Sequence, residues 1–174
     1  MAMPDPDHIA HLRHAFTVAR RARANGKHPF GATLVDEQGR VLMEQENAFD
    51  TEGRTGHAET VLSRRACAAY SAEELARTTM YVSAEPCAMC AGSLYWAGIG
   101  RLVYAMSEEK LKRIIGPHPD NLTLDLPCRV VLASGQRPVE VIGPLLEDDP
   151  EAAALHDGVW DRPPAAIEAP PPGL

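Results

Sequence analysis

A chain of 174 residues is long enough to bury one substantial hydrophobic core, and we expect a single domain. Its formal net charge of -7 argues against a protein whose main task is to bind phosphate backbones, because such proteins carry a basic surface. The sequence has no run of 18 apolar residues and no amino-terminal signal pattern. Neither a membrane span nor secretion is therefore indicated, and we expect a cytoplasmic protein.

Helical and β-prone segments alternate along the chain. Helices are indicated where apolar residues recur at spacings of three and four before a glycine or proline, and strands where short β-prone runs lie between turn residues. In chain order we expect a helix at 8–25, a hairpin of strands at 30–35 and 40–46, a helix at 57–70, a strand at 78–83, a helix from 86 or 87 to 97, a strand at 101–105, a helix at 108–115, β-prone runs at 129–133 and 139–142, and a last helix at 147–156.

This alternation predicts a three-layer α/β/α domain with a central five-stranded mixed sheet. We assign the domain to residues 1–162 and expect the proline-rich residues 163–174 to form a mobile tail. Ligand sites of such sheets commonly lie at the carboxyl ends of the strands. The strand expected at 78–83 runs directly into a Cys-x-x-Cys segment, which places the candidate site there.

Two of the four cysteines, Cys87 and Cys90, are separated by two residues. In a chain without a secretion signal this spacing is typical of a metal or redox site rather than of a disulfide. The two thiols lie on one face near the start of an expected helix, and His57 begins another. Helix starts carry a partial positive charge, which favours thiolates and therefore metal ligation.

His57, Cys87 and Cys90 together predict one zinc ion per chain, since imidazole and thiolate are usual zinc ligands. Three protein ligands leave a position open for water, which is typical of a catalytic site. Glu59 is not expected to bind the same metal as His57, because side chains two positions apart on a helix point in different directions. In the first helical turn, however, its carboxyl can reach the metal-bound water. We therefore predict that Glu59 is the catalytic acid and base. The spacing His-x-Glu followed by Pro-Cys-x-x-Cys is the signature of zinc deaminases.

Two further stretches extend this pattern, Pro-Phe-Gly-Ala at 29–32 and Ser-Ala-Glu-Pro-Cys-Ala-Met-Cys-Ala-Gly-Ser-Leu-Tyr-Trp-Ala at 83–97. Through them the chain up to Tyr104 resembles the cytidine deaminase superfamily, in the branch of bacterial guanine deaminases, fungal-type cytosine deaminases and tRNA adenosine deaminases. The stretch at 83–97 is most similar to bacterial guanine deaminase. The resemblance implies a cytidine-deaminase-like fold, a homodimer and a substrate contact by Asn47.

The chain departs from the family just before His57, where residues 53–56 read Gly-Arg-Thr-Gly in place of the usual Asp-Pro-Thr-Ala. That loop borders the substrate pocket in the family, so the identity of the substrate stays open. The resemblance to guanine deaminases also implies an acidic substrate-binding residue after Tyr104. It corresponds to Asp120, to Asp125 or to neither.

Four residues are predicted to bind the substrate. Asn47 is a polar group suited to orienting a base, while Phe30 and Trp96 are candidate stacking walls. Phe30 would equally suit a place in the core, and a tryptophan in an apolar helix is more often part of the core than of a pocket wall. Ala58 is the fourth predicted substrate-binding residue. Other polar residues are interpreted as solvated loop, cap or helix-face positions, namely His28, His118, His156, Glu108, Glu109, Lys110 and Lys112.

We expect a zinc-dependent hydrolytic deaminase that releases ammonia from a free nucleobase, guanine first and cytosine next. One alternative is a tRNA-specific adenosine deaminase, but residues 147–174 hold one Arg and no Lys where an RNA-binding protein needs a basic face. Another is a non-catalytic zinc scaffold, which has no need of Glu59. A small nucleobase is thus the expected partner, and neither a nucleic acid nor a membrane is.

Overall fold

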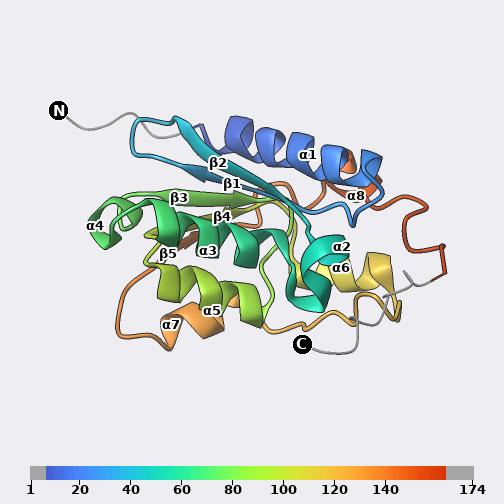
Figure 1. The fold of residues 1–174 in the computed structure, drawn as a ribbon. Helices are drawn as coiled ribbons and strands as arrows, with labels where there is room; N and C mark the ends of the chain where they lie inside the picture. The colour runs from blue at the N-terminus through green and yellow to red at the C-terminus, as the bar shows by residue number, and fades with distance from the viewer. Residues whose placement is uncertain (1–6, 164–174) are drawn as a thin grey trace, which may run out of the picture.

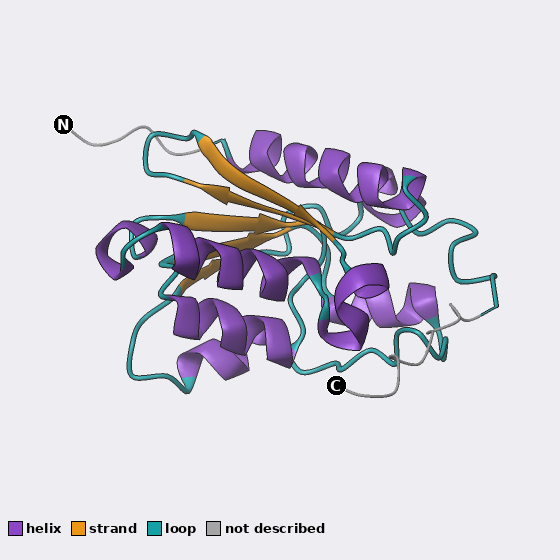
Figure 2. Ribbon diagram, in the orientation of Figure 1, coloured by secondary structure: helices purple, strands orange, loops and turns teal. Residues whose placement is uncertain are grey.

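A twisted five-stranded sheet lies between two layers of helices in the computed structural model of the chain, which describes residues 7–163 (Figure 1, Figure 2). The strand order is β2-β1-β3-β4-β5. β1 pairs antiparallel with β2 and β3, whereas β3, β4 and β5 run parallel to one another. The strands are β1 (Gly31–Val35), β2 (Val41–Glu46), β3 (Thr79–Val82), β4 (Arg101–Tyr104) and β5 (Glu140–Ile142). The predicted α/β class with a five-stranded mixed sheet is confirmed.

Helices cover both faces of the sheet. α1 and α8 lie over one face, and α3, α5 and α7 lie over the other (Figure 1). α6 packs into the same hydrophobic cluster as α1 and α8. The helices are α1 (His8–Ala24), α2 (Phe49–Glu52), the 3-10 helix η1 (Gly53–Thr55), α3 (Ala58–Ala69), α4 (Ala72–Leu75), α5 (Ala88–Ala97), α6 (Glu108–Ile115), α7 (Cys128–Ala133) and α8 (Pro150–Ala154).

The side chains of the inner strands alternate between two hydrophobic clusters. In β3, Met80 and Val82 join the cluster that contains α3, α5 and α7, whereas Tyr81 joins the cluster that contains α1. In β4, Leu102 joins the cluster that contains α3, α5 and α7, and Val103 joins the cluster that contains α1. Because both faces are covered, β1 and β3 are buried along their whole length.

The segment at 129–133, predicted as a β-prone run, is corrected to helix α7. Its valines favour strands by intrinsic preference, but Cys128 and Leu132 lie one helical turn apart and both are buried in the cluster shared with α5. The backbone N–H of Cys128 also donates to the buried carboxylate of Glu85 at 2.9 Å, which anchors the helix start. Tertiary packing therefore overrides local β preference here.

The last helix is shorter than the predicted 147–156. α8 begins at Pro150, directly after Asp149, whose side chain accepts a hydrogen bond from the N–H of Glu151. An N-cap with proline at the first helical position is a strong helix start, so the preceding residues stay outside the helix. The fold also contains three short helical elements that the sequence pattern did not predict, α2, η1 and α4.

No helix within residues 7–163 is long and apolar enough to cross a membrane. The proline-rich tail predicted at 163–174 lies outside the described residues except for Pro163. Residues 1–6 of the domain predicted at 1–162 lie outside them as well.

Candidate active site

Four chain segments meet at one end of the sheet. Gly31 at the start of β1 pairs with Glu46 at the end of β2, and Val82 at the end of β3 pairs with Tyr104 at the end of β4. The residues that precede β1 and those that follow β2, β3 and β4 are therefore neighbours. They line a pocket of about 280 Å³, which is close to the lower end of the roughly 300–1,000 Å³ typical of small-molecule sites.

Two of the three predicted metal ligands, His57 and Cys87, line the pocket, and the third, Cys90, is buried beside them. All three lie at the starts of two helices that pack together. His57 is the N-cap residue of α3, Cys87 is the N-cap residue of α5, and Cys90 lies in the first turn of α5. The Nδ1 atom of His57 lies 3.7 Å from the Sγ atom of Cys87 and 3.4 Å from that of Cys90. The two Sγ atoms are 3.7 Å apart.

These distances fit a tetrahedral zinc ion. With Zn–S bonds of about 2.3 Å and Zn–N bonds of about 2.05 Å, tetrahedral angles require S to S separations of about 3.8 Å and S to N separations of about 3.6 Å. The donor atoms also suit zinc, since thiolate and imidazole are its borderline-soft partners. Within residues 7–163 this is the only group of His, Cys, Asp and Glu donors found close enough to hold a metal ion.

The surroundings of the two cysteines favour a thiolate at Cys87. Hydrogen bonds with Cys90 and with His57 lower the pKa of Cys87 to about 4, although burial opposes the change. The hydroxyl of Thr60 donates to the Sγ atom of Cys90 at 3.3 Å. The pKa of Cys90 is raised instead, by its hydrogen bond with Cys87 and by burial, so Cys87 is the thiolate of the pair and zinc binding would have to displace the proton of Cys90.

Glu59 lies beside the metal ligands without being one of them. Its Oε2 atom is 3.6 Å from the Sγ atom of Cys90, and the residue lines the pocket although only 8% of it is exposed. Burial raises the pKa of Glu59. A carboxyl whose pKa moves toward neutrality can both accept and return a proton, as acid and base catalysis requires.

Three of the four predicted substrate-binding residues line this pocket, namely Asn47, Phe30 and Ala58. Asn47 is buried, and its Oδ1 atom accepts a hydrogen bond from the N–H of Phe49 at 3.0 Å. Its amide nitrogen has no hydrogen-bond partner among residues 7–163, so it can donate to a bound molecule. Phe30 immediately precedes β1 and Asn47 immediately follows β2, which explains why both reach the same pocket.

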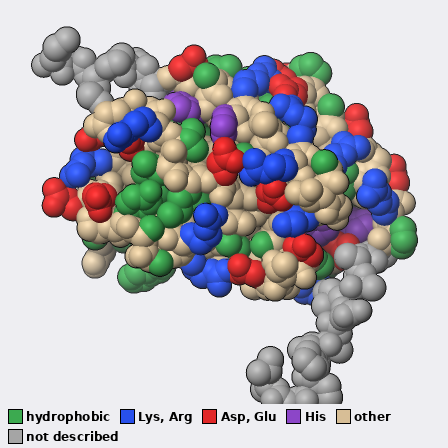
Figure 3. Space-filling view, turned by 45° about the horizontal axis from the view of Figure 1, so that its top comes forward, with side chains coloured by type: hydrophobic (Ala, Val, Ile, Leu, Met, Phe, Trp, Pro, Cys, Tyr) green, Lys and Arg blue, Asp and Glu red, His purple; other side chains and the backbone are tan. Residues whose placement is uncertain are grey.

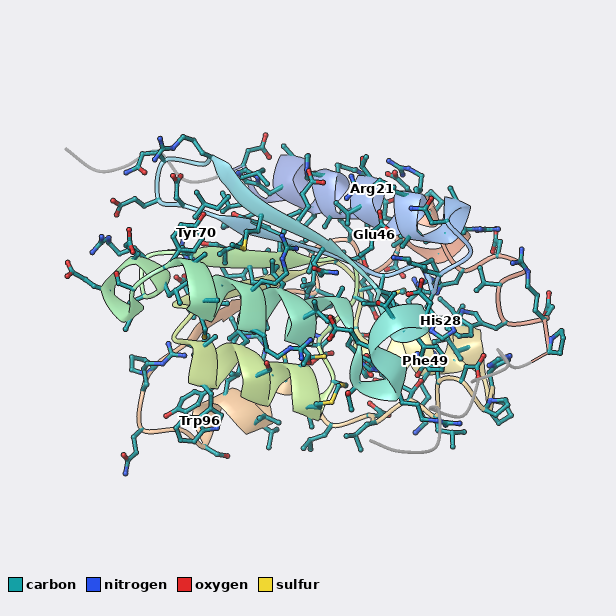
Figure 4. The ribbon with its side chains drawn as sticks, in the orientation of Figure 1. Arg21, His28, Glu46, Phe49, Tyr70 and Trp96 are labelled. Carbon is teal, nitrogen blue, oxygen red and sulfur yellow. The ribbon has the colours of Figure 1, made fainter. Side chains whose placement is uncertain are left out.

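Trp96 does not belong to the pocket, and its interpretation as a stacking wall is corrected. The residue is 85% exposed and lies far from the pocket residues His28 and Phe49 in Figure 4. Leu94 of α5 points into the core, and Trp96 follows it by two residues, about 200° further around the helix. The helix therefore turns Trp96 outward.

The structure separates the two acidic candidates after Tyr104. Asp120 lines the pocket, with its Oδ2 atom 3.8 Å from the Nε2 atom of His28. Asp125 lies outside the pocket lining and pairs instead with Lys112 at 3.3 Å. Of the two candidates, Asp120 is therefore the one placed to contact a molecule in the pocket.

The interpretation of His28 and His156 as solvated is corrected, because the first is half-buried in the pocket wall and the second is buried. His28 lines the pocket with its ring centroid 4.9 Å from that of Phe49, and burial lowers its pKa. His156 is 3% exposed and accepts a hydrogen bond from the Nε1–H group of Trp160 at 3.2 Å. His118 is half-buried as well.

Glu108 was interpreted as part of a solvated helix face, and this too is corrected, because it is 5% exposed and lines the pocket. Arg54 and Glu85 also line the pocket and were missed. The signal that would have found Glu85 and Glu108 is their position shortly after β3 and β4, at the end of the sheet where the other site residues lie.

A three-layer fold with one histidine and two cysteines at paired helix starts, beside a buried carboxyl, defines a zinc-binding deaminase domain. The chain belongs to the cytidine and deoxycytidylate deaminase zinc-binding family, whose model matches residues 5–106. The predicted family and its zinc-binding character are thereby confirmed.

Relatives with different named activities match the chain. A probable cytosine deaminase of Schizosaccharomyces pombe is 38% identical over 155 residues, which are 88% of this chain and 92% of that protein. A tRNA-specific adenosine deaminase of Haemophilus influenzae is 36% identical over 100 residues, or 57% of this chain and 58% of that one. The solved guanine deaminase of Nitrosomonas europaea is 25% identical with a TM-score of 0.69, covering 93% of this chain and 87% of that one. Membership of the family thus leaves the substrate open.

Proposed function

We propose that this chain is a zinc-dependent hydrolytic deaminase that releases ammonia from a free nucleobase, guanine first and cytosine next. The observation that carries the proposal is one pocket of about 280 Å³ that is lined by the zinc ligands His57 and Cys87, by Glu59 and by the orienting residues Asn47 and Asp120. The position of Asp120 supports guanine, and the nearly full-length match to a probable cytosine deaminase supports cytosine.

Zinc, when bound by His57, Cys87 and Cys90, supplies a Lewis acid that lowers the pKa of water to about 7. Glu59 accepts the proton of the attacking water and passes it to the ring nitrogen beside the reacting carbon. The same carboxyl then delivers a proton to the amino group, which leaves as ammonia. Asn47 holds the base in place through its amide nitrogen, and Phe30 provides an apolar wall.

The surface charges support a small substrate over RNA. Arg13, Arg20 and Arg21 on α1 pair with acidic side chains of α8, its N-cap and β2, and Figure 3 shows basic and acidic side chains mixed over this face. A bound RNA backbone needs several unpaired basic residues on one face.

One observation favours the tRNA adenosine deaminase as a second candidate. Arg54 lines the pocket, is exposed, and has no ion-pair partner among residues 7–163, so it is available to contact a phosphate. A single arginine supplies little of the electrostatic attraction that RNA binding requires, so we rank this candidate second.

The test is ammonia release by the zinc-loaded protein from guanine, cytosine, adenine, their nucleosides and a tRNA anticodon hairpin, at about 50 and 200 mM salt. We expect turnover of a free base with a KM that changes little with salt. Efficient deamination of the hairpin with steep salt dependence, and no ammonia from any free base, would instead establish RNA editing. If the protein is instead a non-catalytic zinc scaffold, none of these compounds will be deaminated.

A homodimer and a cytoplasmic location remain predictions. Trp96 of α5 and Val130 of the neighbouring α7 are exposed apolar side chains, which supports the dimer, because a second copy would remove them from water. Sedimentation analysis of the zinc-loaded protein and of Trp96→Lys tests the dimer. We expect a dimer that this substitution weakens.

A further inference from the structure

Glu108 is a buried carboxyl that the proposed reaction does not use. It is 5% exposed and lines the pocket at the first position of α6. Its carboxyl has no hydrogen bond and no ion pair to any of residues 7–163. The neighbouring Glu109 behaves as an ordinary surface residue, because it is exposed and pairs with Arg113 one turn further along the helix.

This arrangement is unfavourable for the free protein. The carboxyl has left bulk water without gaining a partner, and acidic groups surround it. Burial, together with the charges of Cys87, Glu59, Glu85 and Asp125, raises the pKa of Glu108 to about 9. A polar group that is kept in such surroundings despite its cost to stability is a candidate for binding a ligand.

The backbone of Glu108 is held firmly in position. Glu85 accepts a hydrogen bond from the N–H of Glu108 at 3.0 Å through one carboxylate oxygen and from the N–H of Cys128 at 2.9 Å through the other. Ser107 caps α6 by accepting from the N–H of Lys110 at 3.1 Å. The start of α6 is thereby anchored, so the carboxyl is presented to the pocket by a rigid element.

We propose that Glu108 is a specificity-determining residue that hydrogen-bonds N–H groups of an amino-substituted free base in the pocket. This inference rests on the proposed function. It follows from the set of polar groups that face the pocket, in which the carboxyls of Glu59, Glu108 and Asp120 outnumber the one arginine, Arg54.

An acidic lining selects for a ligand rich in N–H donors and free of negative charge. A neutral base with ring and exocyclic N–H groups meets both conditions. A nucleotide does not, because its phosphate would approach these carboxyls. Bound N–H groups would also give Glu108 the partners that the protein itself does not provide.

The test measures binding separately from turnover. In a zinc-loaded Glu59→Gln background, in which turnover is about a hundredfold slower or more, calorimetry gives the Kd of guanine and of cytosine with and without a change at Glu108. N–H groups of a bound base favour the ionised carboxylate of Glu108, which accepts through both oxygens. We therefore expect Glu108→Gln to weaken binding about tenfold, because the amide replaces one of these acceptor oxygens by a donor, and Glu108→Met to weaken it at least as much. Glu109→Met is the matched control and should leave Kd unchanged.

Thermal unfolding distinguishes recognition from a structural role. Glu108→Met removes a buried group without a partner, so its melting temperature should equal or exceed that of the parent while its affinity falls. A Kd within about twofold of the parent for both Glu108 variants overturns the proposal, and the Gln variant alone decides if the Met variant does not fold.

If neither base binds the parent and the wild-type protein releases no ammonia, the proposed function fails and this inference fails with it. Unchanged affinity in a parent that binds a base refutes the role of Glu108 alone.

Discussion

At the scale of residues, the site separates metal binding from proton transfer within one helical turn. His57 is the N-cap of α3 and has an extended backbone with φ of -67° and ψ of 144°, whereas Glu59 has already entered the helix. Their side chains therefore leave the backbone in different directions although only one residue lies between them. His57 reaches the two thiols, and the carboxyl of Glu59 lies next to the Sγ atom of Cys90 without joining the donor group.

We predict that Glu59→Gln retains zinc and the fold but lowers kcat about a hundredfold or more, because an amide cannot accept the proton of water. Metal analysis and steady-state kinetics on the same preparation check this. Cys90→Ala is the matched comparison, since it should lose zinc together with activity. Near-normal turnover by Glu59→Gln would show that another group carries the proton.

At the scale of elements, the site depends on close contact between α1 and the start of β1. A Cβ atom at Gly31 would lie 2.6 Å from the carbonyl oxygen of Ala15 and 2.6 Å from the nitrogen of Ala19. Only glycine allows the helix to approach this closely. Gly31 directly follows Phe30, so the same contact sets the position of one pocket wall.

We predict that Gly31→Ala lowers the free energy of unfolding by about 1–3 kcal/mol, because the added methyl group must displace the backbone of α1. Gly92→Ala is the control, since Gly92 lies inside α5 and a Cβ atom there meets nothing within 4 Å. It should stabilise the helix by roughly 0.5–1 kcal/mol. Urea unfolding measures both changes, and equal effects of the two substitutions would contradict the packing argument.

At the scale of the whole molecule, the segment after α8 is tied to the rest of the fold through a buried histidine. The ring centroid of His156 lies 5.4 Å from that of Phe30, and Trp160 donates to its Nδ1 atom. Burial, assisted by the charge of Arg23, lowers the pKa of His156 to about 4. The folded protein therefore holds this imidazole neutral at pH values where an unfolded chain protonates it.

We predict that stability is fully present above about pH 6.5 and falls as the pH drops toward 4, because the unfolded state then binds a proton that the folded state does not. The loss from His156 alone is about 3 kcal/mol, at about 1.4 kcal/mol for each pKa unit. Unfolding free energies of the wild type and His156→Gln between pH 7 and 4.5 check this. The variant should lose less stability over that range, and parallel curves would contradict the assignment.

The sequence by itself determined the features that depend on neighbouring residues. The spacing of Cys87 and Cys90 and the helix start at His57 predicted a zinc site whose donor distances the structure reproduces, because such motifs are shaped by one or two local turns. Periodicity predicted the main helices and most of the strands for the same reason.

Only the tertiary structure decided what depends on contacts between distant segments. Residues 129–133 became helical because Cys128 and Leu132 pack in the core beside α5, and Trp96 was turned outward by the helical phase that buries Leu94. Glu108 and Asp120 reach the pocket because the chain after β4 returns to the end of the sheet where β1, β2 and β3 have placed the other site residues. Such meetings are set by sheet order and register, which single-sequence patterns do not encode.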